Sequence, residues 1–299
     1  RADRGLTQLF EERHIPYVIA MNKADLITVP ENIPENMIFV SARENGNIHA
    51  LKEKIAALVH SVPPARELIA DLVSPGDAVV LVTPIDSAAP KGRLILPQQQ
   101  TIRSLLDAGC IPVVTRETEL ARTLSRLREP PALVVTDSQA FGMVSRIVPD
   151  SVRLTSFSIL FARYKGDLRT AVLGAAALRR LKDGDTVLIS EGCTHHRQCG
   201  DIGTEKLPRW VRQYTGRDIR FVFTSGGEFP ENLSPYALII HCGACMLGER
   251  EMQSRLRRAA EQCIPVTNYG IAIAQIHGIL DRALRPFSAL HAEWEKQQQ

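Results

Sequence analysis

Two short segments that contain cysteine and histidine constrain the fold of this chain more than any other feature of its sequence. The first is Cys193-Thr194-His195, and the second, His241-Cys242-Gly243-Ala244-Cys245, begins after 45 intervening residues. Thiolate is a natural ligand of zinc and of iron–sulfur clusters, and a Cys-x-x-Cys spacing lets two sulfur atoms reach one metal centre. A fold that uses both segments must therefore bring two distant loops to the same place.

The ligand types leave two kinds of metal site open. Cys193, Cys242 and Cys245 with one histidine can close a tetrahedral zinc site. The same three thiolates can hold a 4Fe-4S cluster in which one iron is bound less firmly by the protein. Either His195 or His241 could be the fourth ligand or could donate a hydrogen bond from outside the ligand set. A chance pattern or a redox dithiol is the remaining interpretation, although a redox dithiol needs no upstream Cys-x-His.

The other three cysteines are interpreted as bystanders. Six cysteines in 299 residues are too few for a secreted disulfide scaffold. Cys110 and Cys263 lie in apolar surroundings, so both are predicted to pack in the core. Cys199 follows Cys193 by six positions in a polar run, and it is interpreted as partly exposed, with a reserve ligand as the alternative.

Composition excludes several functional classes. The net charge of +3 does not indicate nucleic-acid binding, and Arg255, Arg257 and Arg258 are predicted to form the solvated face of a helix. No apolar stretch approaches the roughly 20 residues that span a bilayer, and the chain does not begin with a signal-peptide pattern. We therefore expect a soluble, cytoplasmic protein with no membrane or nucleic-acid partner.

Two polar motifs near the start each follow a predicted strand. The strand at 15–21 ends in Asn22-Lys23-Ala24-Asp25, and the strand at 37–40 ends in Ser41-Ala42-Arg43. Ligand loops of open α/β sheets occupy such strand ends. This pair resembles the guanine-recognition motifs of P-loop GTPases. Asp25 would accept hydrogen bonds from guanine N–H groups, Asn22 would steady the loop and reach the base, and Lys23 would pack its stem over the ring. In the second motif, Ser41-Ala42-Arg43, the backbone N–H of Ala42 would meet the guanine carbonyl.

The loop that cradles nucleotide phosphates is missing from the sequence. Gly-x-x-x-x-Gly-Lys-Ser/Thr occurs nowhere in the chain, so this polypeptide is predicted not to hydrolyse GTP. The chain begins with Arg1, within what is predicted to be a helix. We expect it to be a fragment of a longer parent that supplies the phosphate-binding half and binds GTP with Mg²⁺.

The rest of the chain alternates strands with helices, which predicts small, mainly parallel sheets. The fold class is therefore α/β: a partial P-loop GTPase-type domain followed by two smaller α/β domains. The predicted boundaries are 1–62 for the GTPase part, 63–75 for a linker, 76–150 for a domain that mediates association, and 151–299 for the metal-binding domain. The predicted elements after the linker are strands at 78–83, 111–115, 132–136, 186–190, 219–224 and 237–240, and helices at 98–108, 118–128, 168–181 and 206–214.

The strands at 186–190 and 237–240 decide whether the metal motifs can meet. Cys193 lies just past the first strand, and His241 is expected immediately after the second. If the two strands are parallel neighbours, both motifs leave the sheet at the same edge. Close approach to a bulky cluster is predicted to be helped by the nearby glycines 192, 200, 243 and 248.

In order along the chain, these motifs resemble HydF, the GTPase-type scaffold family of FeFe-hydrogenase maturation. The segments Pro84 to Arg93 and Thr155 to Phe161 resemble the middle domain and the third-domain entrance of that family. The resemblance implies a GTPase domain, a dimerisation domain and a cluster-binding domain. It departs at the phosphate-binding loop and switch motifs, which this sequence lacks.

The resemblance also implies a function. HydF proteins hold a 4Fe-4S cluster on three cysteines that correspond here to Cys193, Cys242 and Cys245, with His195 and His241 at the motif histidines. They accept a diiron precursor assembled with HydE and HydG and deliver it to the hydrogenase HydA, as homodimers or higher oligomers. Because cyanide ligands make the precursor anionic, basic side chains should hold it. The candidates near the site in sequence are Arg163, Lys165 and Arg197, and another interpretation is that these three are ordinary solvated surface residues. The alternative is a zinc-stabilised interaction module fused to a regulatory GTPase.

Overall fold

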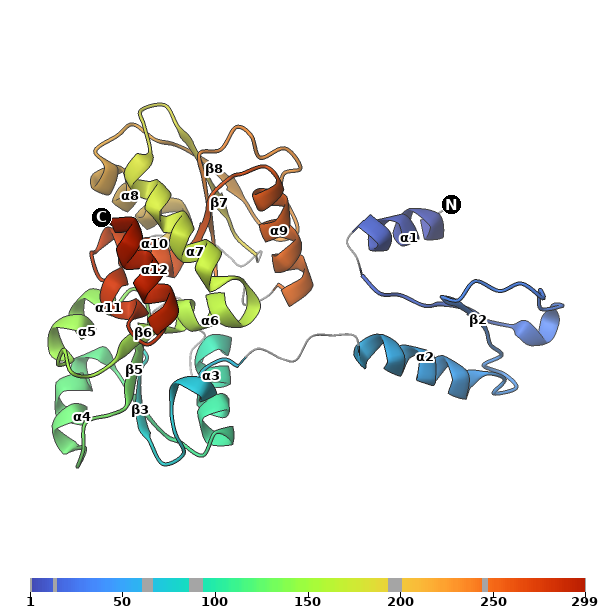
Figure 1. The fold of residues 1–299 in the computed structure, drawn as a ribbon, viewed down its shortest axis with the longest axis horizontal. Coiled ribbons are helices and arrows are strands. Elements are labelled where there is room, and N and C mark those ends of the chain that lie inside the picture. The colour runs from blue at the N-terminus through green and yellow to red at the C-terminus, as the bar shows by residue number, and fades with distance from the viewer. Residues whose placement is uncertain are drawn as a thin grey trace. The chain divides into compact units, whose positions relative to one another are not determined.

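The computed structural model describes residues 2–12, 15–60, 67–85, 94–192, 201–243 and 247–298. The chain divides into two compact units, Arg1–Ala65 and Arg66–Gln299, and each is described by itself (Figure 1). The division falls close to the expected end of the first domain at residue 62.

The first unit is built on a two-stranded parallel sheet. Its core contains Ile38, Phe39 and Val40, which are all buried. The first strand is shorter than the expected 15–21, because Pro16 has no N–H to donate to a ladder. In chain order the unit contains α1 Ala2–Glu12, β1 Ile19–Met21, a 3₁₀ turn at Ala24–Leu26, β2 Met37–Phe39 and α2 Ile48–His60.

The second unit begins with a four-stranded parallel sheet in the order β4-β3-β5-β6. Its central strands are runs of valine and leucine buried on both faces, as is typical of parallel sheets covered by helices. The elements are a 3₁₀ turn at Ala70–Leu72, β3 Ala78–Val82, α3 Leu96–Asp107, β4 Ile111–Thr115, a 3₁₀ turn at Glu117–Glu119, α4 Leu120–Arg126, β5 Leu133–Thr136, α5 Phe141–Ile147 and β6 Leu154–Ser156.

This first sheet extends beyond the predicted boundaries at both ends. At the start, Leu68 and Ile69 are buried in the core under β3, so the described residues from 67 onward belong to the sheet domain and not to a linker. At the other end, β6 pairs with β5 and lies past the expected boundary at residue 150. The reason is that Leu154 and its neighbours complete the sheet before the chain turns into α6 Phe157–Lys165.

A second four-stranded parallel sheet follows, in the order β10-β9-β7-β8. The helix expected at 168–181 is α-helical only to Ala175 and continues as a 3₁₀ turn. The elements are α7 Leu168–Ala175, a 3₁₀ turn at Ala176–Arg180, β7 Thr186–Ser190, a π-helical turn at Ile202–Lys206, α8 Leu207–Thr215, β8 Arg220–Thr224, β9 Leu238–His241, α9 Glu249–Glu261, β10 Val266–Asn268, α10 Tyr269–Ile276, α11 Leu280–Leu284 and α12 Ser288–Gln298.

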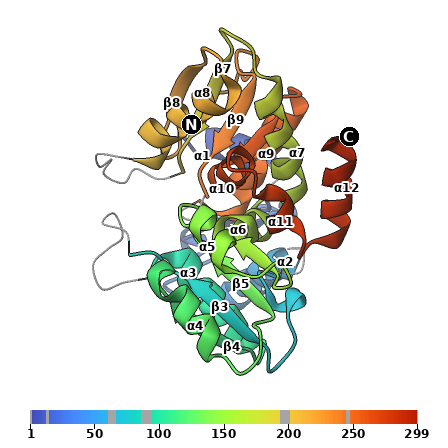
Figure 2. The ribbon, with the colours of Figure 1, turned by 90° about the vertical axis from the view of Figure 1, so that its left-hand side faces the viewer.

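The last strand of each sheet runs directly into a helix, and these two helices join the sheets. Ser156 caps α6 by accepting from the Ile159 N–H at 3.3 Å, and Asn268 caps α10 by accepting from the Ile271 N–H at 2.8 Å. The Asn268 side chain also donates to the Ser158 carbonyl at 3.2 Å. Figure 2 shows α6, α10 and α11 between the two sheets.

One hydrophobic cluster is shared by both sheets. It contains Val80 and Val134 from the first sheet, Val172 from α7 and Ile271 from α10, all fully buried, together with Trp294 from α12. Residues 66–299 therefore form one compact unit although they contain two sheets.

Candidate metal centre

The strands that carry the two metal motifs are parallel neighbours. β7 and β9 pair in register, with Ser190 opposite His241. This confirms the arrangement on which the predicted meeting of the motifs depended. One detail differs: His241 is the last residue of β9 rather than the first residue after it, because its side chain is buried against α9.

The residue before the first motif, Gly192, contacts Cys242 of the second motif. The Gly192 N–H donates to the Cys242 Sγ at 3.0 Å, and the Cys242 N–H donates to the Ser190 carbonyl at 2.9 Å. Gly192 directly precedes Cys193 in the sequence, so the described chain leading to the first motif contacts the sulfur atom of the second. A thiolate that accepts a backbone N–H hydrogen bond is the form of sulfur ligand that tunes iron–sulfur centres. The donor atom and its surroundings therefore fit a thiolate-bound metal.

The other predicted ligands cannot be placed. Cys193, His195 and Cys245 lie outside the described residues, and so does Cys199. The three-cysteine ligand set therefore stays a prediction, of which the structure places only Cys242 and its neighbour His241.

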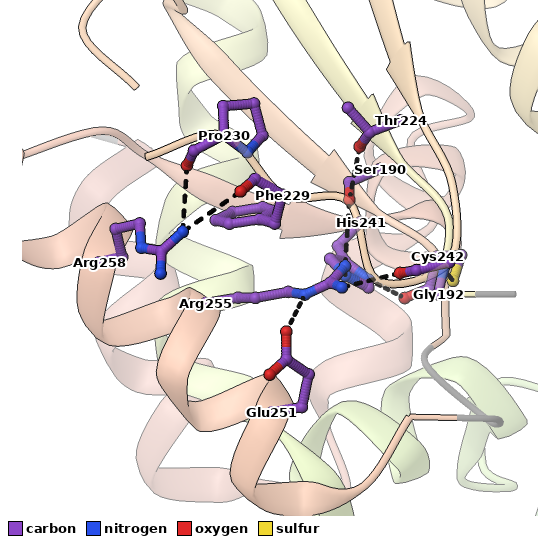
Figure 3. A network of polar contacts seen from close by, with 11 residues as sticks. Ser190, Gly192, Thr224, Phe229, Pro230, His241, Cys242, Glu251, Arg255 and Arg258 are labelled. Carbon is purple, nitrogen blue, oxygen red and sulfur yellow. Dashed lines mark hydrogen bonds and ion pairs between the residues drawn. The ribbon is translucent and has the colours of Figure 1, made fainter. Parts of the chain in front are cut away.

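His241 is held in a buried polar network (Figure 3). Its side chain is 1% exposed, its Nε2 lies 3.1 Å from Nη1 of Arg255, and its Nδ1 lies 2.9 Å from the Cys242 carbonyl oxygen. A guanidinium group has only donors, so Nε2 must accept and the proton sits on Nδ1, which donates to the carbonyl. Burial lowers the pKa of His241 to about 4, which agrees with a neutral ring near neutral pH.

The predicted exposure of Arg255 is wrong. This residue was predicted on a solvated helix face, but it is 2% exposed. Met252, Leu256 and Ala259 are buried on α9, and position 255 follows Met252 by three residues, so it lies on the same face of the helix. That spacing could have predicted the burial of Arg255, but a charged side chain is usually expected to be exposed. Arg258 is also partly buried and donates to the Phe229 and Pro230 carbonyls.

A pocket that is partly open to solvent lies beside Cys242. Its walls are mainly apolar, with Phe161 from α6 and Met252 and Leu256 from α9. Lys165 also lines it and lies with its Nζ 5.9 Å from the centre of the Phe161 ring. The pocket is lined as well by Thr267, whose buried hydroxyl has no hydrogen-bond partner among the described residues.

The three basic residues named from the sequence have different surroundings. Lys165 lines the pocket beside Cys242. Arg163 instead forms a two-point ion pair with Asp71, with Nη1 2.8 Å from Oδ1. Arg197 lies outside the described residues.

The two bystander cysteines that the structure describes differ in exposure. Cys110 is buried, as predicted, and burial raises the pKa of its thiol. Cys263 is exposed, so the prediction that it packs in the core is wrong. Cys263 lies in the turn after the end of α9, where its φ of 57° is in the left-handed region.

In the first unit, the two predicted guanine motifs are joined by hydrogen bonds. Asn22 Oδ1 accepts from the N–H groups of Lys23 and Ala42, at 2.8 and 3.1 Å. Ser41 Oγ donates to Asp25 Oδ1 at 2.6 Å. Asn22 therefore links the two loops, whereas its expected contact with a guanine base stays a prediction. The Ala42 N–H that was expected to meet a guanine carbonyl is bonded to Asn22 here.

Two models of known protein families together match most of the second unit. The model of the Hydrogen maturase F dimerization domain matches residues 68–166, and that of the Hydrogen maturase F tetramerization domain matches residues 169–286. The chain belongs to the HydF family. Comparison with curated proteins gave no match. Membership in the HydF family supports a role in hydrogenase maturation, and its two oligomerization domains support formation of a homo-oligomer.

The HydF matches also locate the candidate site. All three predicted cysteine ligands and Arg255 fall within the match to the HydF tetramerization domain, whereas the guanine motifs lie before either match. The boundary between the HydF matches falls between α6 and α7, close to the end of the first sheet as the structure has it. No helix in the described ranges of this HydF chain has the length and apolar character needed to cross a membrane.

Proposed function

We propose that the chain is the carrier part of a cytoplasmic HydF protein. It holds a 4Fe-4S cluster on Cys193, Cys242 and Cys245, receives a diiron precursor made with HydE and HydG, and passes the precursor to the apo form of HydA. The observation that carries this proposal is the Gly192 N–H···Sγ Cys242 contact at the ends of two adjacent parallel strands. It supports a shared site because it joins the residue before the first motif to a cysteine of the second, 50 positions apart in the sequence.

The pocket beside Cys242 supports the cargo part of the proposal. Carbonyl ligands of iron are weakly polar and suit apolar walls such as Phe161 and Met252. Cyanide ligands carry negative charge and accept hydrogen bonds at nitrogen, which suits a lysine ammonium and a hydroxyl. Lys165 and Thr267 supply these two groups at the pocket wall.

Guanine-nucleotide binding is proposed for the longer parent protein, in which a phosphate-binding loop would complete the site with GTP and Mg²⁺. The contacts between Asn22 and Ala42 and between Ser41 and Asp25 support it, since they hold the two motifs together. A parent protein whose affinity for GTP survived Asp25→Ala unchanged would contradict this assignment.

Anaerobic reconstitution of the full chain with iron and sulfide tests the cluster. We expect about four irons per chain and one EPR signal from the reduced cluster. Cys242→Ser should abolish the signal, because it removes the thiolate that accepts the Gly192 N–H. Cys263→Ser is the matched control and should leave iron content unchanged. Cys263 is exposed and follows the C-terminal end of α9, whereas Cys242 precedes that helix in the sequence.

Two results would separate the proposal from its alternative. A colourless chain that holds one zinc and no iron would favour the zinc-stabilised interaction module. The other result is a chain that holds the cluster but cannot activate apo-hydrogenase after incubation with the diiron precursor. This result would support the cluster assignment and contradict the carrier function.

A further inference from the structure

Both ring nitrogens of His241 are already used by the protein. Nε2 accepts from Arg255 at 3.1 Å, and Nδ1 donates to the Cys242 carbonyl at 2.9 Å. A histidine binds a metal through an unprotonated nitrogen whose lone pair is free. In this arrangement neither nitrogen of His241 meets that condition.

Arg255 is fixed by contacts that do not depend on His241. Its Nε donates to Glu251 at 3.0 Å, and its Nη2 donates to the Gly226 carbonyl at 2.8 Å. The guanidinium carbon also lies 5.1 Å from the centre of the Phe229 ring. Glu251 on α9 and two residues of the loop after β8, Gly226 and Phe229, thus hold the guanidinium group in place independently of the histidine. In Figure 3 it points from α9 toward the ends of β7 and β9.

The same guanidinium group also connects the two strands of the site. Nη1 of Arg255 lies 3.4 Å from Ser190 Oγ on β7 and 3.1 Å from His241 Nε2 on β9. Ser190 Oγ in turn accepts from Thr224 Oγ1 on β8 at 3.1 Å. Arg255 therefore contacts the last residue of each strand that leads to a metal motif.

We propose that Arg255 is a positioning residue that keeps His241 out of the ligand set of the metal. By occupying Nε2, it directs the Nδ1 proton to the Cys242 carbonyl, so His241 fixes the backbone of a ligand cysteine instead of binding iron. This rests on the proposed cluster site. If Arg255 has this role, the fourth iron is open to a ligand other than His241. Of the two roles that the sequence left open for His241, metal ligand or hydrogen-bond donor from outside the ligand set, the proposal assigns the second.

The first test needs no metal. Nitrogen NMR of the full, cluster-free chain with ¹⁵N-labelled histidine reports which ring nitrogen carries the proton. The signals of His241 among the 8 histidines are those that disappear in His241→Gln. We expect the Nδ1–H form in the wild type near neutral pH and its loss or mixing with the Nε2–H form in Arg255→Lys. A wild-type ring protonated at Nε2 would overturn the proposal.

Arg255→Lys is chosen because the buried site keeps its positive charge. A lysine ammonium can pair with Glu251, but it lacks the planar fork that reaches Glu251, Gly226 and His241 together. Arg255→Met removes the charge and serves as a second variant. Circular dichroism identifies a variant that does not fold, and the wild-type measurement still decides the proposal in that case.

The second test uses the reconstituted cluster and pulsed EPR. We expect no coupling from a directly bound histidine nitrogen of His241 in the wild type, so His241→Gln should leave the nitrogen couplings unchanged. Arg255→Lys should add such a coupling by freeing Nε2, and Arg255→Lys/His241→Gln should lose it again. Wild-type coupling that disappears in His241→Gln, or no new coupling in a folded, cluster-loaded Arg255→Lys chain, would overturn the proposal.

The two tests also separate failure of this inference from failure of the proposed function. A chain that binds no cluster refutes the proposed function, while the ring proton of His241 is still measured by NMR. A chain that binds the cluster through His241 keeps the proposed function and refutes the role assigned to Arg255.

Discussion

At position 192, the absence of a side chain allows the residue after β7 to pack closely against the segment that follows β9, at Cys242 and Leu247. A Cβ added to Gly192 would lie 2.7 Å from Cγ of Leu247 and 3.6 Å from the Cys242 Sγ. Gly192→Ala should therefore displace Leu247, at a cost of about 1–3 kcal/mol for overpacking, and reduce the iron bound per chain after reconstitution.

Gly243→Ala is the matched control for this prediction. Gly243 adjoins Cys242 on the other side, but a Cβ there would meet no atom within 4 Å. Iron content of this variant should equal that of the wild type. Equal iron loading in both variants would show that close packing at Gly192 is not needed for the site.

The residues of the site differ in how well the sequence predicted them. The positions of His241 and Cys242 followed from the strand pattern, because a parallel sheet places loops after β7 and β9 at one edge. The role of Arg255 did not follow, since a charged residue on a helix is exposed far more often than it is buried. Its burial depends on partners from three other segments, namely Ser190, Gly226 and His241, and no local pattern encodes them.

At the scale of elements, β-branched runs were the most reliable signal. The strands at 111–115 and 186–190 were predicted with the bounds that the structure has, because valine and isoleucine runs between turn residues favour strands, whether at the edge of a sheet as in β4 or inside it as in β7. The helix at 168–181 was predicted too long: alanine and leucine favour helix throughout, but the chain tightens to a 3₁₀ turn after Ala175. Helix α6 was missed as a separate element, because residues 156–167 were interpreted as an entrance to α7.

Helix α7 can lie against β10 only because position 174 is glycine. A Cβ on Gly174 would lie 1.9 Å from the Val266 carbonyl oxygen and 2.5 Å from its carbon. These are backbone atoms and cannot move aside cheaply. Gly174→Ala should lower the free energy of unfolding by at least about 1–3 kcal/mol, the usual range for overpacking, as measured by chemical denaturation of the cluster-free chain.

Gly142→Ala, in helix α5, provides the comparison. A Cβ at Gly142 would meet nothing within 4 Å, so the substitution should raise the free energy of unfolding by up to about 1 kcal/mol through helix propensity. If both substitutions changed stability in the same direction, close contact between α7 and β10 would not explain the glycine at 174.

At the scale of the whole molecule, the two sheets offer different edges for association. Among the described residues, β4 pairs only with β3 and β8 pairs only with β7. These two edge strands expose apolar side chains, with Ile111 and Val114 on β4 and Val222 and Phe223 on β8, whereas the opposite edge strands, β6 and β10, are buried. The first edge lies in the matched dimerization domain and the second in the matched tetramerization domain. We expect a second copy to cover each edge.

A charge on each edge tests this assignment. Val114→Lys should weaken the dimer at least about tenfold, which corresponds to about 1.4 kcal/mol, because a lysine on an edge strand opposes pairing. Val222→Lys should leave the dimer intact and prevent the tetramer. Light scattering across a range of protein concentrations measures both effects. A Val114→Lys chain with wild-type association would place the dimer contact elsewhere.

The hydrophobic cluster that both sheets share has a consequence for how the gene can evolve. Val80 and Val134 on the first sheet and Val172 and Ile271 from the second family segment bury one another's apolar surface. A gene that encoded either segment alone would produce a chain with half of this core facing water. Recombination between the two segments should therefore be selected against, and genomes should encode the dimerization and tetramerization segments side by side in one reading frame rather than as exchangeable modules.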